Sequence, residues 1–175
     1  TSARLLQDDG ERGTLGLSDM LADEPEIRVT ARIVLNMGGV WIDGINRDVQ
    51  PKASRKILGT KGAHIVVKLP DACREHGLAT PLVEEIERLA NVATAPDEVD
   101  WLVREANAML PGAKVKADDV VFTWAGVRPL TYDETMPFGK RSREIHDLSG
   151  DGLRGVFAMT MGSVMNHRSG GRDVT

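Results

Sequence analysis

The chain has 175 residues, of which 41% are hydrophobic and 27% charged, a composition typical of a folded globular protein. Its 22 lysines and arginines stand against 26 acidic residues, and this balance argues against a nucleic-acid partner, since phosphate backbones attract basic proteins. No apolar run is long enough to span a bilayer, and the single Cys73 favours a reducing, cytoplasmic setting because it leaves no intrachain disulfide.

The first half of the chain predicts two strands bounded by glycine turns. Residues 1–26 are polar and weakly periodic, which is typical of a flexible arm or a loose hairpin. Ile27–Asn36 is rich in β-branched residues and predicts a strand that ends at Met37–Gly39. Gly59–Gly62 is expected to form a turn before a second strand at Ala63–Leu69.

The second half predicts two helices and two further strands. Leu82–Ala95 carries apolar residues at helical spacing and predicts a helix that faces the core. Pro96–Leu110 predicts a second helix, with a proline and two acidic residues in its first turn. Val120–Val127 predicts a strand broken by Arg128–Pro129, and Val156–Thr160 predicts another. Without regular β-α alternation, this mixture favours an α+β fold, with a mixed or antiparallel sheet and packed helices.

Several catalytic patterns are weak or absent. Cys73 and His76 have spacing suited to one helical face, but no second ligand pair completes a zinc site, so we expect no metal. Ser163 lacks the flanking residues of a nucleophile turn. The glycine pairs at Gly38–Gly39 and Gly59–Gly62 are too short for a dinucleotide fingerprint or a P-loop, and predict turns between strands.

Two basic features of the sequence predict that the chain binds an anion. Arg128 follows an apolar strand and precedes a proline, a setting that can aim a guanidinium at a phosphate or carboxylate, with a surface ion pair as the alternative. Lys140–Arg143 forms a second basic cluster, which by itself is typical of a solvated loop. From the residues alone, the sequence predicts an anion-binding rim.

Five segments, taken in order, are similar to one known family. They are the strand and turn at 31–43, the Lys-Gly-Ala-His segment at 61–67, the strand and Arg-Pro-Leu at 119–130, the Ser-Arg-Glu at 142–144, and the glycine segment at 162–168. Together they resemble FAD-dependent glycerol-3-phosphate dehydrogenases, within the D-amino-acid-oxidase-like flavoproteins. The resemblance covers most of the chain. It implies a substrate-binding domain together with remnants of an FAD-binding domain.

The resemblance also implies an activity and roles for particular residues. The family oxidises the secondary alcohol of a phosphorylated polyol, passing a hydride to the flavin. Arg128 and Arg143 would bind the substrate phosphate, for which a guanidinium is well suited. His64 would be the catalytic base, since a histidine can accept a proton near neutral pH.

Cofactor-binding residues follow from the same resemblance. Gly38, Gly39 and Gly162 would bring the main chain close to FAD, because no side chain stands in the way. Trp41 and Arg168 fall in the same two segments and would complete the FAD site. The expected cofactor is therefore FAD, with no metal.

The sequence also departs from the family pattern. Ser163 stands where the family carries a lysine, which leaves open whether the substrate is glycerol 3-phosphate or a related polyol phosphate. No amino-terminal Gly-x-Gly-x-x-Gly is present, and the chain begins with threonine, so we expect a piece of a longer flavoenzyme that is inactive alone. The missing amino-terminal FAD domain is the expected partner. Contact of the complete enzyme with a membrane surface or quinone would lie in missing parts.

The implied domain organisation has four parts. They are an arm or hairpin at 1–26, an FAD-domain strand and turn at 27–46, a substrate-binding domain at 47–155, and a return to the FAD domain at 156–175. Two alternatives remain open. The chain could be a non-catalytic binding or interaction module, or a flavoprotein that acts on an amine or amino acid.

Overall fold

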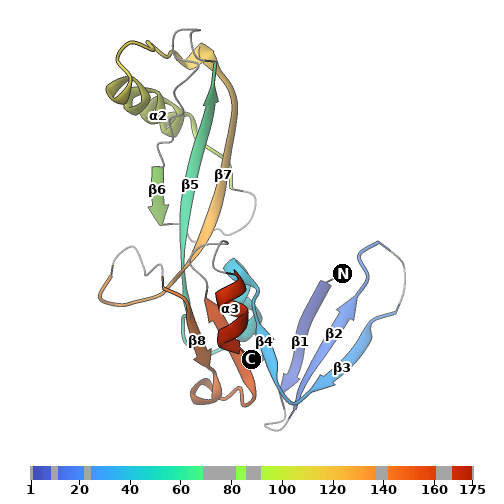
Figure 1. Ribbon diagram of the computed structural model, residues 1–175. Coiled ribbons are helices and arrows are strands. Elements are labelled where there is room, and N and C mark those ends of the chain that lie inside the picture. The colour runs from blue at the N-terminus through green and yellow to red at the C-terminus, as the bar shows by residue number, and fades with distance from the viewer. Residues whose placement is uncertain are drawn as a thin grey trace. The chain divides into compact units, whose positions relative to one another are not determined.

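The computed structural model describes most of the chain. The described residues are 2–8, 12–21, 25–68, 82–85, 92–136, 142–160 and 167–174. The chain divides into two compact units (Figure 1): unit 1 comprises Thr1–Leu58 and Pro129–Thr175, and unit 2 comprises Gly59–Arg128. None of the described helices combines the length and the apolar character that crossing a bilayer requires. The four-part assignment of cofactor and substrate domains stays a prediction.

Unit 1 begins with a three-stranded antiparallel sheet. Strands β1 (Ser2–Asp8), β2 (Gly13–Ser18) and β3 (Ile27–Ala31) follow one another in space as in sequence. The pairing of β1 with β2 shifts register between Leu5 and Gln7. This shift accommodates one unpaired residue in β1, as in a β-bulge.

A second sheet of unit 1 has the order β4-β9-β8. Strand β4 (Val34–Asn36) pairs in parallel with β9 (Val156–Thr160), and β8 (Glu144–Asp147) pairs with β9 in the antiparallel sense. The strand predicted at 156–160 is confirmed. The single strand predicted at 27–36 is wrong, because the chain leaves its partner β2 after β3 and changes sheets before β4.

One hydrophobic core joins the parts of unit 1. Helix α1 (Ile42–Val49) follows a short 3-10 turn, η1 (Gly39–Trp41), and its Ile42 is only 1% exposed. Burying such side chains together is the main source of stability in a domain of this size. The core also contains residues from β1, β4, β9, the start of strand β5 (Ile57–Val67) and the segment 148–153: Leu5, Val34, Ile57, Leu148, Leu153, Val156 and Ala158.

Unit 2 is built around a sheet of order β6-β5-β7 (Figure 1). The strands are β5 (Ile57–Val67), β6 (Leu82–Glu85) and β7 (Val120–Thr131). The helix predicted from Leu82 is wrong at its start, because Leu82–Glu85 pairs with β5. The turn predicted at residues 59–62 is also wrong, since β5 begins at Ile57 and includes them. In both places, pairing between strands overrides local propensity.

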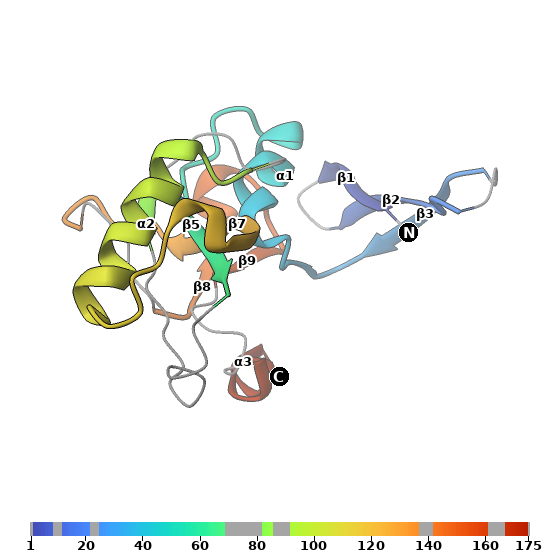
Figure 2. The same ribbon diagram turned by 90° about the horizontal axis from the view of Figure 1, so that it is seen from above.

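Helix α2 (Pro96–Met109) confirms the helix predicted at residues 96–110. It lies beside β5 in unit 2 (Figure 2). Strand β7 does not break at Arg128–Pro129 as predicted but continues to Thr131. The proline is tolerated because β7 is an edge strand of the sheet.

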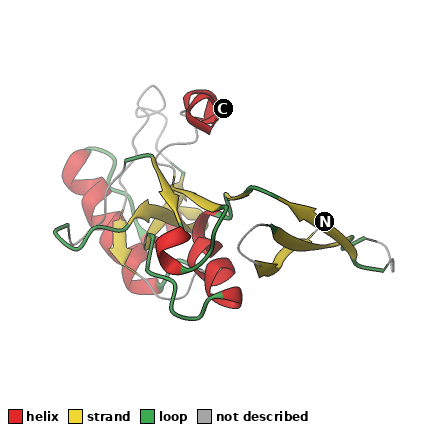
Figure 3. Ribbon diagram, turned by 90° about the horizontal axis from the view of Figure 1, so that it is seen from below, coloured by secondary structure: helices red, strands yellow, loops and turns green. Residues whose placement is uncertain are grey.

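The remaining described helical elements are short. They are η3 (Ala117–Asp119), η4 (Ser149–Asp151) and α3 (His167–Val174). Helices and strands both contribute to the described structure (Figure 3), and the expected α+β class is confirmed.

Candidate functional site

Strands β5 and β7 carry a histidine stacked on a tryptophan. The rings of His64 and Trp124 are parallel to within 1°, with centroids 3.8 Å apart. His64 is half-buried and Trp124 is 48% exposed. The Nδ1 atom of His64 is buried and has no hydrogen-bond partner among the described residues. The pair therefore lies at the surface of unit 2, with one edge of the imidazole covered.

The guanidinium of Arg128 lies over a glycine of the neighbouring strand. A Cβ atom built on Gly62 would be 3.1 Å from Nη2 and 3.2 Å from Cζ of Arg128. Alternate residues of a strand share a face, so Gly62 and His64 lie on one face of β5, and Trp124 and Arg128 on one face of β7. Because the stack and the close approach each join these strands, all four residues share one face of the sheet. This catalytic-face cluster brings the predicted base together with one of the two predicted phosphate ligands.

No described carboxylate forms an ion pair with Arg128, so nothing in that part of the chain neutralises the guanidinium. Arg128 is also partly exposed. An exposed guanidinium beside an imidazole suits a small anionic ligand with a hydroxyl group, since the first can bind the anion and the second can exchange a proton.

Arg143, the second predicted phosphate ligand, has partners within the chain. Its Nη1 donates to Ser169 Oγ over 2.5 Å, and its Nη2 is 2.6 Å from Asp173 Oδ2. Both partners belong to α3. A phosphate at Arg143 would therefore have to share the guanidinium with Asp173 or displace it. Arg168, a predicted FAD ligand, is exposed on the same helix.

The predicted FAD residues Gly38, Gly39 and Trp41 form a tight turn after β4. Asn36 holds this turn, because its Oδ1 accepts from Gly38 N over 3.0 Å and its Nδ2 donates to Ile42 O over 3.1 Å. A side chain at Gly38 would collide with the Ile45 side chain, since its Cβ would lie 2.6 Å from Cδ1. The side-chain amide of Asn36 is therefore already hydrogen-bonded within the turn.

The turn leaves bare main chain at one edge of a sheet. Gly39 has φ +59°, a left-handed conformation that favours glycine, and among the described residues only Pro129 Cγ comes within 4.0 Å of the position that a Cβ would take. Since β4 and β9 are parallel, the turn follows the same edge at which β9 ends. Cofactors of α/β folds bind outside the carboxyl ends of parallel strands. The residues present therefore fit FAD, with Trp41 58% exposed beside the glycines.

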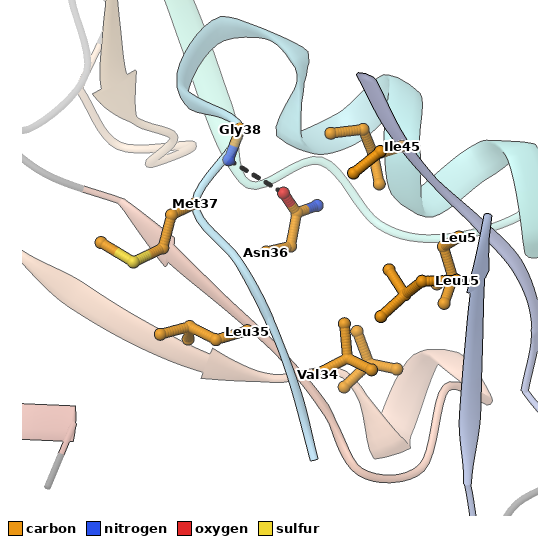
Figure 4. A pocket seen from close by; sticks show the side chains of 10 residues that line it. Leu5, Leu15, Val34, Leu35, Asn36, Met37, Gly38 and Ile45 are labelled. Atoms are coloured by element: carbon orange, nitrogen blue, oxygen red, sulfur yellow. Dashed lines mark hydrogen bonds between the residues drawn. The ribbon is translucent and has the colours of Figure 1, made fainter. Parts of the chain in front are cut away.

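A cavity of about 260 Å³ lies beside this turn in unit 1. Figure 4 shows Leu5 and Leu15 of the first sheet facing Val34 of β4, with Asn36 and Gly38 at one end. Its lining is mainly apolar. The Asn36 side chain also donates to Asn46 Oδ1 over 2.9 Å, so this polar group in the lining is satisfied by the chain itself.

Two polar clusters were not anticipated from the sequence. Thr131 Oγ1 and Thr160 Oγ1 are 2.7 Å apart, both buried, and His146 Nε2 lies 3.3 Å from Thr160 Oγ1. Burial first, and the nearby Lys56 charge second, lower the pKa of His146 below its ordinary value. These residues come from three separate strands, and no sequence spacing indicates that they meet.

The second unexpected cluster is a buried ion pair in unit 2. Lys61 Nζ is 2.7 Å from Glu98 Oε2, and both side chains are at least nine-tenths buried. The ion pair of Lys61 was missed because residues 59–62 were expected to form a turn. Trp124 was also missed, because the predicted strand ended at Val127 and did not include Arg128. The observed β7 continues to Thr131, so Trp124 and Arg128 lie on one face of it.

Some predicted or excluded residues lie outside the described residues. Gly162, the remaining predicted FAD contact, is one of them, as is Ser163. The excluded metal ligands Cys73 and His76 and the basic residues Lys140 and Arg141 are others.

Comparison with known proteins agrees with the fold and with these motifs. The model of the family described as "FAD dependent oxidoreductase" matches residues 4–167. The chain belongs to this family. A glycerol-3-phosphate dehydrogenase of Synechocystis sp. is 30% identical over 81% of this chain and 31% of its own length. An aerobic glycerol-3-phosphate dehydrogenase of Staphylococcus aureus is 25% identical over 89% of this chain and 31% of its own.

A solved structure has the same fold. The glycerol-3-phosphate dehydrogenase of Bacillus halodurans, complexed with FAD, superposes with a TM-score of 0.66 and 20% identity over 98% of this chain and 36% of that one. The family resemblance stated from the sequence motifs is confirmed. The chain spans about a third of the length of these relatives.

Proposed function

We propose that this chain is the substrate-binding part of an FAD-dependent oxidoreductase that acts on glycerol 3-phosphate or a related polyol phosphate. The observation that carries the proposal is the catalytic-face cluster, which combines the Arg128 guanidinium with the His64 imidazole. Membership of the FAD-dependent family and the glycerol-3-phosphate dehydrogenases among its relatives support the same reaction.

The reaction converts a secondary alcohol into a ketone. It breaks the O–H and C–H bonds of the carbinol and forms a C=O double bond. FAD, when bound, supplies the acceptor for the C–H hydrogen and its electron pair. His64 takes the hydroxyl proton as general base, which requires its ring to lie within hydrogen-bond reach of the substrate oxygen.

Arg128 binds the substrate phosphate. A guanidinium can donate two parallel hydrogen bonds to phosphate oxygens, which fixes both the position and the orientation of the ligand. Holding the carbinol beside the base in this way removes much of the entropic cost of reaction. Arg143 is a second phosphate ligand in this proposal, and Asp173 is the group with which the phosphate competes.

The cofactor-binding residues of the chain are Gly38, Gly39 and Trp41 in the turn after β4, with Gly162 and Arg168 in the carboxy-terminal segment. The open backbone of Gly39 supports close approach of a flat group. An amino-terminal nucleotide-binding domain is the partner that supplies the rest of the FAD site. We assign the complete enzyme to the cytoplasm.

Calorimetric titration of the full chain with glycerol 3-phosphate tests this proposal. Saturable binding is expected, with affinity falling roughly tenfold or more in Arg128→Ala, since a charge-assisted pair is lost. Arg104→Ala is the matched control, because Arg104 is exposed on α2 of the same unit and should leave the affinity unchanged. Equal affinity in Arg128→Ala and wild type would contradict the phosphate role. Binding of a small amino acid instead would favour the amino-acid alternative.

A further inference from the structure

The stack of His64 on Trp124 restricts rotation of the imidazole ring about χ2 more than the position of His64 in the strand would do alone. The χ2 torsion of histidine is broad, so the plane of a free ring, and with it the direction of Nε2, varies. A parallel partner with a centroid distance of 3.8 Å and an interplanar angle of 1° keeps the ring in one plane. Trp124 is therefore placed to hold the plane of the His64 ring.

Burial then distinguishes the two nitrogens of His64. The Nδ1 atom is buried and makes no hydrogen bond within the described part of the chain. A substrate on the exposed side of the sheet cannot reach a covered atom. Only Nε2 can then meet a substrate hydroxyl.

We propose that Trp124 is a positioning residue, which holds the His64 ring with Nδ1 covered so that Nε2 is the atom that accepts the substrate proton. This inference rests on the proposed function, because it assumes that His64 is the base. In the step itself, the hydroxyl O–H bond breaks and its proton moves to Nε2, while FAD, when bound, would supply the acceptor for the C–H hydrogen and its electron pair.

Placement of the cluster supports a role in orientation. Trp124 and Arg128 share a face of β7. The residue proposed to orient the base and the residue proposed to bind the phosphate therefore belong to the same strand. Trp124 does not itself donate or accept the transferred proton, and we therefore do not count it as a catalytic residue. Its effect should be felt in the rate of the chemical step more than in substrate affinity.

Proton and nitrogen NMR of the full chain tests the placement without any activity. The ring protons of His64, assigned with His64→Gln, should resonate upfield because they lie over the indole. Trp124→Leu should remove this shift, and Trp124→Phe should keep part of it. The matched control Phe122→Leu should leave it unchanged, since Phe122 is exposed on the same strand and, among the described residues, it is Trp124 whose ring stacks on His64. Equal shifts in wild type and Trp124→Leu would overturn the inference.

Glycerol 3-phosphate supplies a second readout from the same samples. Its addition should move the His64 Nε2 resonance more than that of Nδ1, because the ligand contacts Nε2 directly. A larger response of Nδ1 than of Nε2 in the wild type would overturn the assignment of the proton-accepting atom.

Kinetics of the FAD-loaded holoenzyme complete the test. In Trp124→Leu, kcat should fall roughly tenfold while KM stays within about twofold, and Trp124→Phe should recover most of the rate. A Trp124→Leu enzyme with unchanged kcat would overturn the positioning role. If the wild-type holoenzyme oxidises no polyol phosphate, the proposed function fails, and the ring shifts still decide whether Trp124 holds His64.

Discussion

Gly62 sets how closely the Arg128 guanidinium can lie to strand β5. In Gly62→Ala, the new Cβ would lie 3.1–3.3 Å from three guanidinium atoms, so the group must shift by a few tenths of an ångström. We expect the affinity for glycerol 3-phosphate to fall severalfold, because bidentate pairing depends on geometry. The unfolding free energy should change by less than about 1 kcal/mol, because the atoms that must give way are the far end of the flexible Arg128 side chain. Calorimetry and urea unfolding measure the two quantities.

Gly112→Ala is the control for this substitution. It adds the same methyl group to the exposed turn after α2, where no atom of the described residues lies within 4 Å of the new Cβ. An equal loss of affinity in both variants would show that Gly62 has no specific relation to Arg128.

His146 gives the stability of the chain a predictable dependence on pH. Burial and the Lys56 charge lower its pKa, against the opposing effects of Glu144 and Asp43. The unfolded chain therefore binds this proton more readily, and stability present above about pH 6.5 is lost as the pH falls through the lowered folded-state pKa. His146→Gln should weaken this loss between pH 7.5 and 5 in urea-unfolding measurements. A slope identical to that of wild type would contradict the assignment.

Arg128 was predicted as an anion ligand from its local setting, whereas His64 was predicted as a base only from the family resemblance. The structure brings both residues to one face of a sheet, and their roles stay predictions. The partners that position them could not be found from local sequence, because Gly62 and Trp124 act through contacts between β5 and β7. Likewise, no local pattern indicates that Asp173 pairs with Arg143.

At the scale of elements, the Lys61–Glu98 ion pair attaches the start of α2 to β5. Glu98 Oε2 also accepts from Ala95 N over 2.5 Å, so one carboxylate serves both the helix cap and the ion pair. Lys61→Met would leave this carboxylate buried without a counter-charge. We expect a loss of about 3–5 kcal/mol in the free energy of unfolding.

A double variant separates the ion pair from simple packing. Lys61→Met combined with Glu98→Gln removes both charges and keeps an acceptor for Ala95 N, so it should recover much of the lost stability. Lys68→Met is the surface control, since Lys68 is exposed and should change stability little. Equal losses in the single and double variants, measured by urea unfolding, would count against a charge effect.

Elements were predictable where local signals and tertiary pairing agree. Helix α2 begins with a proline and acidic residues and keeps helical spacing, and β9 is a short β-branched and apolar run. The helix prediction at Leu82–Glu85 was wrong because the apolar spacing of this segment fits a helix, whereas pairing with β5 makes it a strand. The turn prediction at residues 59–62 was wrong because their glycines suggest a turn, whereas these residues lie in the buried part of β5.

At the scale of the whole molecule, family membership and partial length together define what this chain contributes. It covers 31% of the length of its Synechocystis relative, and it carries a glycine turn that fits FAD as well as a sheet face on which His64 and Arg128 lie together. We therefore expect substrate recognition to be measurable on this chain, while turnover requires the nucleotide-binding domain as well.

Residue-resolved NMR of the labelled chain during titration with glycerol 3-phosphate tests this account most directly. Saturable changes centred on His64, Trp124 and Arg128 are predicted, because these residues share the face proposed to bind the substrate. Glycerol without phosphate should produce much weaker changes, since it offers Arg128 no anion. Saturable binding elsewhere, with these three residues unperturbed, would contradict the account, as would the absence of any saturable change.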